Sequence, residues 1–350
     1  MPLDWGSSYS CEWRIYKVNT DTWLEGEEVT NFVNDITLSK DSTDSVPLLE
    51  SGSMSMDGRF EDELTDGYYR IVVHAHQSPY HERHPLATLL FEKSSDEISE
   101  YIDVTTMDGR SVLKPAADIT CLAGTYAPKG VDGAEWVRNL LSECISAPIE
   151  INGTGFTLDD PISFSGGTSY LSMCWSVLDT AKWCMQIDGD GIVTILKIPE
   201  ESELLLANNA RHFMQPKLTR DRDLLDIPNR YIAVFGDNVE VAENHNRDSS
   251  VSYESRGRWV DYYDSSPKRV NGETAYAYSR RRLEEESTRV VKWTYDREYL
   301  PEVVPFDLME ASIPEYGFDG QLRVLSQKYK LDKGIVVSET CGVEYKEFIA

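Results

Sequence analysis

Short β-favouring segments, separated by turn-rich pieces, fill the first third of the chain and constrain its fold more than any other feature. The segment YYRIVVHAHQ, residues 68–77, is rich in the β-branched and aromatic residues that favour strands. Further strands are predicted at residues 11–18, 35–38, 86–92 and 98–104, with turns such as LSKDSTDSVP and MDGRFEDELTDG between them. This spacing predicts a small barrel or sandwich over residues 1–118.

The middle of the chain, residues 119–198, has a different pattern. Apolar residues from Trp136 to Ile145 recur at helical spacing after Asp132, which can cap a helix. A second amphipathic helix is predicted from about residue 171 to 181, with Thr168 as its N-cap. With a strand-like IEI between the helices, the region is predicted as helix, strand, helix and β-hairpin.

The hairpin is predicted from QIDGDGIVTI, residues 186–195, in which Asp and Gly alternate between apolar runs. A calcium loop starting at Asp188 would have Ile192 as its fifth residue and Val193 in place of the glycine, so its ligand spacing fails. A phosphate cradle fails as well, because the β-branched residues that follow do not favour a helix. Asp-Gly between β-favouring runs is typical of a tight hairpin turn. We therefore expect no bound cation, and we expect Asp188 and Asp190 to serve the turn or face solvent.

Residues 199–350 return to β-favouring patterns. Strands are predicted at residues 230–235, 239–242, 258–263, 289–295, 303–309, 322–330 and 334–339, with a helix at about 273–286. The predicted fold class is mainly β with an α/β insertion (α+β). Two small β-barrel-like domains, residues 1–118 and 199–350, flank the α/β region of residues 119–198, and the second barrel-like domain carries the inserted helix.

Charge and cysteine content limit the functions that this chain can have. The net charge is −26, from 60 acidic and 34 basic residues, which opposes binding to nucleic acid or anionic lipid. It does not exclude a pore through which nucleic acid slides, and the alternative is that the charge serves solubility alone. The start MPLDWGSSYS does not resemble a secretory signal, and no apolar run reaches the ~18 residues of a membrane span. Six scattered cysteines without a C-x-x-C pair indicate folding in a reducing cytosol.

Catalytic chemistry is weakly represented in the sequence. The best cluster is HAHQSPYHERH, residues 74–84, where His74 and His76 would share one strand face and the following loop could return His81 or His84. It lacks the helical spacing of a zinc protease, and whether it binds a metal is left open. Cys174 and Cys184 are predicted to be buried rather than reactive. We therefore predict no enzyme activity, no catalytic, cofactor-binding or metal-binding residue, and no cofactor.

Three stretches resemble the tail hub proteins of bacteriophages, also called baseplate hub or tail-tip proteins. They are GTSYLSMCWSVLDTAKWCMQIDGDGIVTI, DRDLLDIPNRYIAVFGDN and VPFDLMEASIPEYGFDGQLRVLSQKYKLDKGIVVSETC. The resemblance covers residues 168–341 and departs from the family pattern at Phe306-Asp307, where a Gly before the acid is expected. Residues 1–118 fit the family in length and β character only.

The resemblance implies a structural virion protein of the tail tip, folded in the host cytoplasm. It would be a ring-shaped homotrimer whose subunits each offer two similar β-barrel domains, closing the distal end of the tail tube and passing DNA through an acidic channel. Implied partners are the distal tail ring or tube protein, the tape measure protein and a tip fibre or spike, with no stable membrane association. Alternatives are a carbohydrate-binding or carbohydrate-active β protein, suggested by eight Trp and 19 Tyr, and another tail component such as the distal tail ring protein.

Two predictions about assembly follow from this resemblance. A trimer of chains with a charge of −26 repels itself, so Lys and Arg should gather at subunit contacts and acids should line the channel. Arg280, Arg281 and Arg282, beside the acidic residues 284–286, are the predicted contact, with a solvated helix face as the alternative. The two β regions should also superpose on each other, because both contribute to one pseudo-six-fold ring.

Overall fold

The computed structural model describes residues 9–42, 48–57, 64–98, 103–198, 213–221, 224–269, 272–301, 303–305, 307–313, 318–331 and 335–348. Within these ranges one large sheet, three small sheets and five α-helices are present, so the chain is mainly β with helices in its middle, as predicted. None of the helices in this part of the chain is both long and apolar enough to cross a bilayer.

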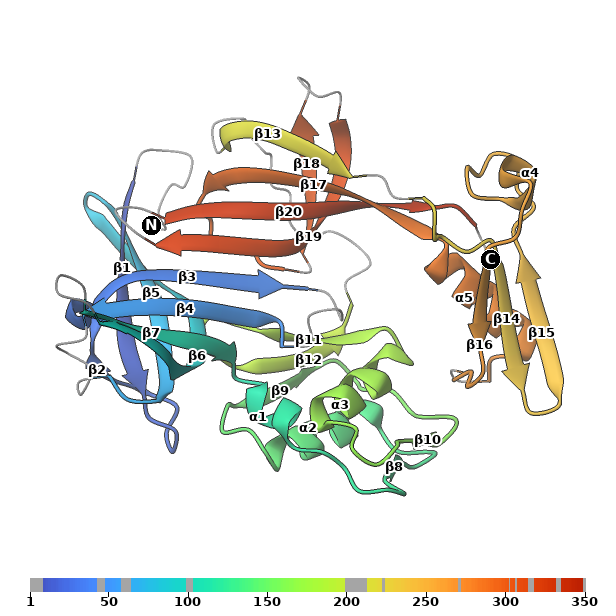
Figure 1. Cartoon of the computed structure of the whole chain (residues 1–350), viewed down its shortest axis with the longest axis horizontal. Coiled ribbons are helices and arrows are strands. Elements are labelled where there is room, and N and C mark those ends of the chain that lie inside the picture. Colours follow the sequence, from blue (N-terminus) through green and yellow to red (C-terminus); the bar gives the residue numbers. More distant parts are fainter. Residues whose placement is uncertain are drawn as a thin grey trace.

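Twelve strands, paired antiparallel throughout, form the large sheet (Figure 1). From one edge to the other the order is β13 (Phe213–Asp221), β17 (Thr288–Glu298), β20 (Ile335–Lys346), β19 (Phe318–Leu331), β3 (Val33–Asp41), β4 (Glu50–Asp57), β7 (Asp103–Ser111), β6 (Tyr80–Ile98), β5 (Gly67–Gln77), β1 (Ser10–Val18) and β2 (Glu25–Glu28), with β18 (Leu308–Ile313) pairing β19 beside this path. A 3-10 turn, η1 (Thr30–Phe32), precedes β3.

The two terminal β regions meet where β3 pairs with β19. Leu38 lies opposite Tyr329 and Ile36 opposite Leu331, and these four side chains are buried in one core. The predicted barrel-like domains are not closed barrels in the described part of the chain, because β3 pairs with β19 at the edge that closure would have required. The boundaries at residues 118 and 198 stay predictions.

The predicted middle unit of helix, strand, helix and hairpin is confirmed. It consists of α2 (Gly133–Ser142), β9 (Ile149–Asn152), α3 (Tyr170–Asp179) and the hairpin of β11 (Trp183–Ile187) and β12 (Val193–Lys197), with β12 also parallel to β9. A short helix α1 (Lys114–Asp118) and the pair β8 (Tyr126–Ala127) and β10 (Ile162–Ser163) complete the region. Its core continues into the N-terminal strands through Trp23, Leu49 and Tyr68.

The helix caps of this region were predicted with mixed success. The Oδ1 of Asp132 accepts hydrogen bonds from two backbone N–H groups in the first turn of α2, at 2.9 and 3.2 Å, which confirms this cap. The cap of α3 is Ser169, whose Oγ accepts from Ser172 N at 3.1 Å. Thr168 was the wrong choice by one residue, because its hydroxyl donates to the carbonyl of Ser165 in the preceding turn.

The strand predictions missed β2, β4 and β13 and placed another strand too early. β4 was missed, because ESGSMSMD contains few β-favouring residues, yet Met54 and Met56 are fully buried on one face. The strand expected at 303–309 begins only at Leu308. The described residues before it form a turn in which the Asp307 carboxylate accepts a hydrogen bond from Val304 N at 2.9 Å.

A buried ionic cluster connects β17, β19 and β20. Arg297 donates to Glu339 Oε2 through its Nε at 3.1 Å and Nη2 at 2.6 Å, while Gln327 and Tyr295 donate to the same carboxylate at 2.8 and 2.6 Å. Burial would raise the pKa of Glu339, but Arg297 and the other donors hold that pKa below its ordinary value. The carboxylate is therefore ionised, and both of its oxygens accept hydrogen bonds from side chains inside the sheet.

The third region is a small sheet covered on one face by a helix. Its strands lie in the order β15 (Asn238–Glu243), β14 (Arg230–Phe235) and β16 (Asp261–Asp264). In the chain, α4 (Tyr253–Arg256) lies between β15 and β16, and α5 (Ala275–Glu286) follows β16. Tyr278 and Leu283 of α5 pack against Tyr231 and Ala233 of β14. In Figure 1 this unit lies at the right, far from β1, β2 and β5 at the left.

Candidate functional site

The tip of the β11–β12 hairpin is a tight turn, as predicted. The Asp188 N–H donates to the carbonyl oxygen of Ile192 at 3.2 Å, and the Asp188 Oδ1 accepts a hydrogen bond from Ile192 N at 2.8 Å. Gly191 has a φ of +75°, a conformation that favours glycine. The side chain of Asp188 therefore serves the turn.

This turn is docked on the large sheet rather than left in solvent. The Asp190 carbonyl accepts from Arg70 Nη2 at 2.7 Å and from Trp23 Nε1 at 2.8 Å, and the Gly189 carbonyl accepts from Thr88 Oγ1 at 2.9 Å. The Asp190 side chain is 43% exposed, so it faces solvent in part, as expected, but it also forms an ion pair with Arg70 Nη1 at 3.0 Å that was not predicted. The absence of a cation at the turn stays a prediction.

Close packing fixes the position of the tip. A Cβ added to Gly189 would lie 1.8 Å from the carbonyl oxygen of Pro85, although the φ of Gly189 is not positive. Trp23, which is buried and donates to the tip, has a φ of +59°, a conformation that costs about 1–3 kcal/mol for a non-glycine residue. The hairpin and the N-terminal strands are thus fitted to each other over sequence separations of more than a hundred residues.

The histidine cluster is partly assembled as predicted. His74 Nδ1 lies 3.2 Å from His81 Nε2, and the rings of His76 and His81 have centroids 4.6 Å apart. His84 is not part of this stack and pairs with Glu82 at 3.1 Å. Burial is the main cause that lowers the pKa of His74. In the ranges that the structure describes, no three His, Cys, Asp or Glu side chains are placed to hold a metal ion.

The three arginines of α5 make contacts within the chain. Arg281 pairs with Glu273 at 2.8 Å and with Glu285 at 3.0 Å. Arg282 pairs with Glu285 at 2.9 Å and with Glu286 at 2.7 Å. The Arg280 guanidinium lies over the ring of Phe348, 4.9 Å from its centroid. Their role as a subunit contact stays a prediction.

The outer face of the small sheet carries apolar side chains without a covering element among the described residues. On β15, Val241 lies opposite Ile232 and Val239 opposite Val234 of β14. On β16, which pairs with the other edge of β14, Tyr263 lies opposite Ile232. Val239, Val241 and Tyr263 are 58%, 43% and 64% exposed. The sequence predicted the strands but not this uncovered face, although the alternation of Val239 and Val241 with Glu240 was the available signal. Such a patch is typical of a protein-binding surface.

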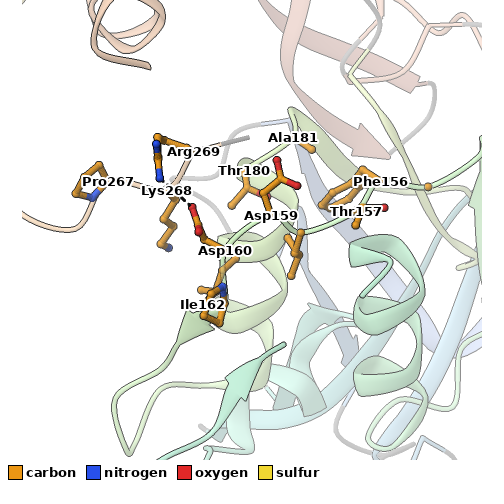
Figure 2. A pocket seen from close by; sticks show the side chains of 13 residues that line it. Phe156, Thr157, Asp159, Asp160, Ile162, Thr180, Ala181, Pro267, Lys268 and Arg269 are labelled. Atoms are coloured by element: carbon orange, nitrogen blue, oxygen red, sulfur yellow. Dashed lines mark ion pairs between the residues drawn. The ribbon is translucent and has the colours of Figure 1, made fainter. Parts of the chain in front are cut away.

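A cavity of about 390 Å³ separates residues 155–162 from residues 267–269 (Figure 2). Asp159 accepts a hydrogen bond from Gly272 N at 2.8 Å, and Asp160 faces Arg269 across the cavity at 3.9 Å. Both carboxylates are thus engaged by the small-sheet region of the same chain. This cavity therefore lies at the boundary between the α/β region and the small-sheet region.

The buried cysteines are poor nucleophiles. Cys174 and Cys184 are buried, as predicted, and burial raises the pKa of Cys184 to about 12 and that of Cys174 still further. A thiol with such a pKa is protonated at neutral pH and does not attack substrates.

Comparison with known proteins places the fold. No protein-family model and no curated protein sequence matches the chain. Among solved structures, the tail protein of Neisseria meningitidis MC58 superposes with a TM-score of 0.69 at 11% identity, over 95% of this chain and 97% of that one. The 43 kDa tail protein of prophage MuSo2 from Shewanella oneidensis gives 0.65 at 11% identity over 95% and 98%.

The chain has the fold of phage tail proteins. A third tail protein, gp18 of a Listeria monocytogenes EGD-e prophage, superposes with a TM-score of 0.53 at 12% identity over 96% and 95% of the two chains. The resemblance seen in the sequence is confirmed at the level of this tail-protein fold, including residues 1–118, which matched in length and β character only.

Proposed function

We propose that this protein is a structural component of a phage tail, and specifically a trimeric hub that closes the distal end of the tail tube. The observation that carries the proposal is the end-to-end superposition on tail proteins, which covers at least 95% of both chains in two cases. In such a role the work is done by shape and subunit contact, so no reacting group is needed. The buried, protonated thiols agree with this.

Charge supports passage of DNA through the ring. With a net charge of −26 per chain, an acidic channel wall would not hold phosphates, whereas a basic wall would bind them by counterion release. In this proposal the neighbouring proteins are the distal tail ring or tube protein, the tape measure protein, and a fibre or spike at the tip.

The uncovered face of the small sheet supports a role in subunit contact. Burying Val239, Val241 and Tyr263 against a neighbour would remove apolar area from water at roughly 25 cal/mol per Å². We therefore propose this face as one contact of the ring. It is a better candidate than the α5 arginines, because Arg281 and Arg282 already have carboxylate partners in their own chain.

The test is the mass of the purified chain in solution together with class averages of the particles. We expect three copies in a three-fold ring, and Val241→Asp should reduce the trimer fraction strongly. Leu122→Asp is the matched control, since Leu122 is 83% exposed and lies outside the small sheet. A six-fold ring would indicate a distal tail ring protein instead, and a monomer at all concentrations would contradict the proposal.

A further inference from the structure

A second, smaller cavity of about 120 Å³ lies where three parts of the chain meet. Its walls are the adjoining ends of β3 and β4, the turn end of the β11–β12 hairpin, and residues 304–305. Lys40 and Glu50 face each other across β3 and β4 in direct register, and Asp188 of the hairpin also lines the cavity. The volume is sufficient for several water molecules or for one small planar group.

Glu50 is the unusual residue of this cavity. It is only 2% exposed, and its Oε2 has no hydrogen-bond donor among the described residues. The ammonium of Lys40 lies 3.0 Å from Oε1, and Asp188 is a like-charged neighbour. Buried carboxylates of folded proteins normally accept several hydrogen bonds, because a buried acceptor without a donor costs about 1–3 kcal/mol.

The backbone holds Glu50 in this position. Leu49, directly before it, is 3% exposed and has a φ of +62°. The Leu49 carbonyl accepts a hydrogen bond from Asp41 N at 2.6 Å, and Glu50 N donates to Leu48 O at 2.7 Å. A buried leucine in the left-handed region is rare and is retained only where its surroundings determine it. The carboxylate of Glu50 is therefore held at the wall of the cavity.

The cavity attracts cations that carry hydrogen-bond donors. Three carboxylates, those of Asp41, Glu50 and Asp188, line it together with one ammonium group, that of Lys40. Burial is the main cause that raises the pKa of each of these acids. No three metal-ligating side chains converge on one point in the described part of the chain, which disfavours a metal ion.

We propose that this cavity binds a guanidinium group, which donates to the Oε2 of Glu50 and is also attracted by Asp188. A guanidinium carries several N–H donors in one plane and can donate to two carboxylates at once, whereas a compact ammonium group, such as that of Lys40 at Oε1, has no such planar spread. The group is carried either by an arginine side chain of another polypeptide or by free arginine. The proposal does not depend on the proposed function.

The test uses the full chain, labelled with ¹⁵N, and follows backbone amide signals during titration. The probes are the tripeptide acetyl-Gly-Arg-Gly-amide, its citrulline analogue, which is neutral but similar in shape, and free L-arginine. We expect the arginine tripeptide to shift the signals of Glu50, Ile187 and Asp188 saturably, and the citrulline tripeptide to leave them unchanged. Equal binding of free arginine would indicate a small-molecule ligand, and binding of the tripeptide alone would indicate a polypeptide.

Variants connect the binding to the cavity. Glu50→Gln should weaken binding of the arginine tripeptide by about tenfold or more, because a charge-assisted pair becomes a neutral one. Asp188→Asn, which keeps an oxygen for the turn, should weaken it less. Asp160→Asn, in the other cavity, is the matched control and should have no effect. The proposal is overturned if the citrulline tripeptide binds equally, if Glu50→Gln leaves affinity unchanged, or if no signal shifts saturably.

Discussion

Two ion pairs of the large sheet, Arg297 with Glu339 and Lys40 with Glu50, are about equally hidden from solvent, and both join strands of the same sheet. Glu339 accepts four hydrogen bonds from Arg297, Gln327 and Tyr295, whereas Glu50 has the Lys40 ammonium 3.0 Å from its Oε1 and no donor at Oε2 among the described residues. Burial acts on both carboxylates, yet the pKa of Glu339 is lowered and that of Glu50 is raised. The number of donors, and not burial, separates a carboxylate that serves the fold from one that is available to a ligand.

The same isosteric substitution should have very different effects at the two positions. Glu339→Gln leaves Arg297 buried without a carboxylate, so we expect a loss of about 3–5 kcal/mol in the free energy of unfolding. Glu50→Gln also leaves the buried Lys40 ammonium without a carboxylate, but it removes a pair with a single donor, so we expect a smaller loss of about 1–3 kcal/mol. Urea unfolding of both variants at neutral pH measures the difference. Equal losses would contradict the comparison.

The position of Asp188 beside Glu50 depends on the docked hairpin tip. Gly189→Ala forces a Cβ against the Pro85 carbonyl, and we expect a loss of about 1–3 kcal/mol from this overpacking. Gly26→Ala is the matched control, since its Cβ would meet its nearest neighbour, the carbonyl oxygen of Lys17, at an ordinary 3.4 Å, and its φ is not positive. Thermal unfolding of both variants measures the effect. If both lose the same stability, the tip is not held by this contact.

The pH dependence of stability should have opposite signs for the two acids. A lowered folded-state pKa gives Glu339 a stabilising contribution above the unfolded pKa of about 4.3, which is lost as pH falls through the folded pKa. A raised pKa makes ionisation of Glu50 costly, so its penalty is absent at acid pH and grows as pH rises from the unfolded towards the folded pKa. Nearby Asp307, whose pKa burial raises to about 6, adds to this second trend.

The measurement for this prediction is the free energy of unfolding from pH 2.5 to pH 8 in the wild type and the two Gln variants. The wild type should have a larger free energy of unfolding than Glu339→Gln at neutral pH, and this difference should shrink only at the acid end of the range. Relative to Glu50→Gln, the wild type should become less stable as pH rises. A Glu50→Gln curve parallel to the wild type would show that Glu50 has an ordinary pKa.

Sequence reasoning succeeded where structure depends on near neighbours. The cap at Asp132 and the turn at Asp188 are formed by residues a few positions away, so their residue types are sufficient to predict them. It failed where partners are distant. Trp23 reaches Asp190 over 167 residues, and Glu50 lies in a strand with few β-favouring residues. The cavity at Glu50 could not be predicted, because its walls come from three separate parts of the chain.

The arginines of α5 illustrate a related limit. Three consecutive basic residues next to acids are consistent with a subunit contact or with ion pairs inside the chain. The partners of Arg281 include Glu273, which lies before the first residue of α5, so helical spacing does not predict this contact. The uncovered face of β14–β16 was equally hidden from sequence analysis, since only the position of α5 decides which face remains open.

The difference between the two carboxylates is tested most directly by a ¹³C NMR titration of glutamate side chains in the intact protein. The Glu50 and Glu339 signals are assigned by their disappearance in the two Gln variants. We predict that Glu50 titrates above, and Glu339 below, the ordinary glutamate pKa of about 4.3. Titration of both groups on the same side of that value would contradict the account.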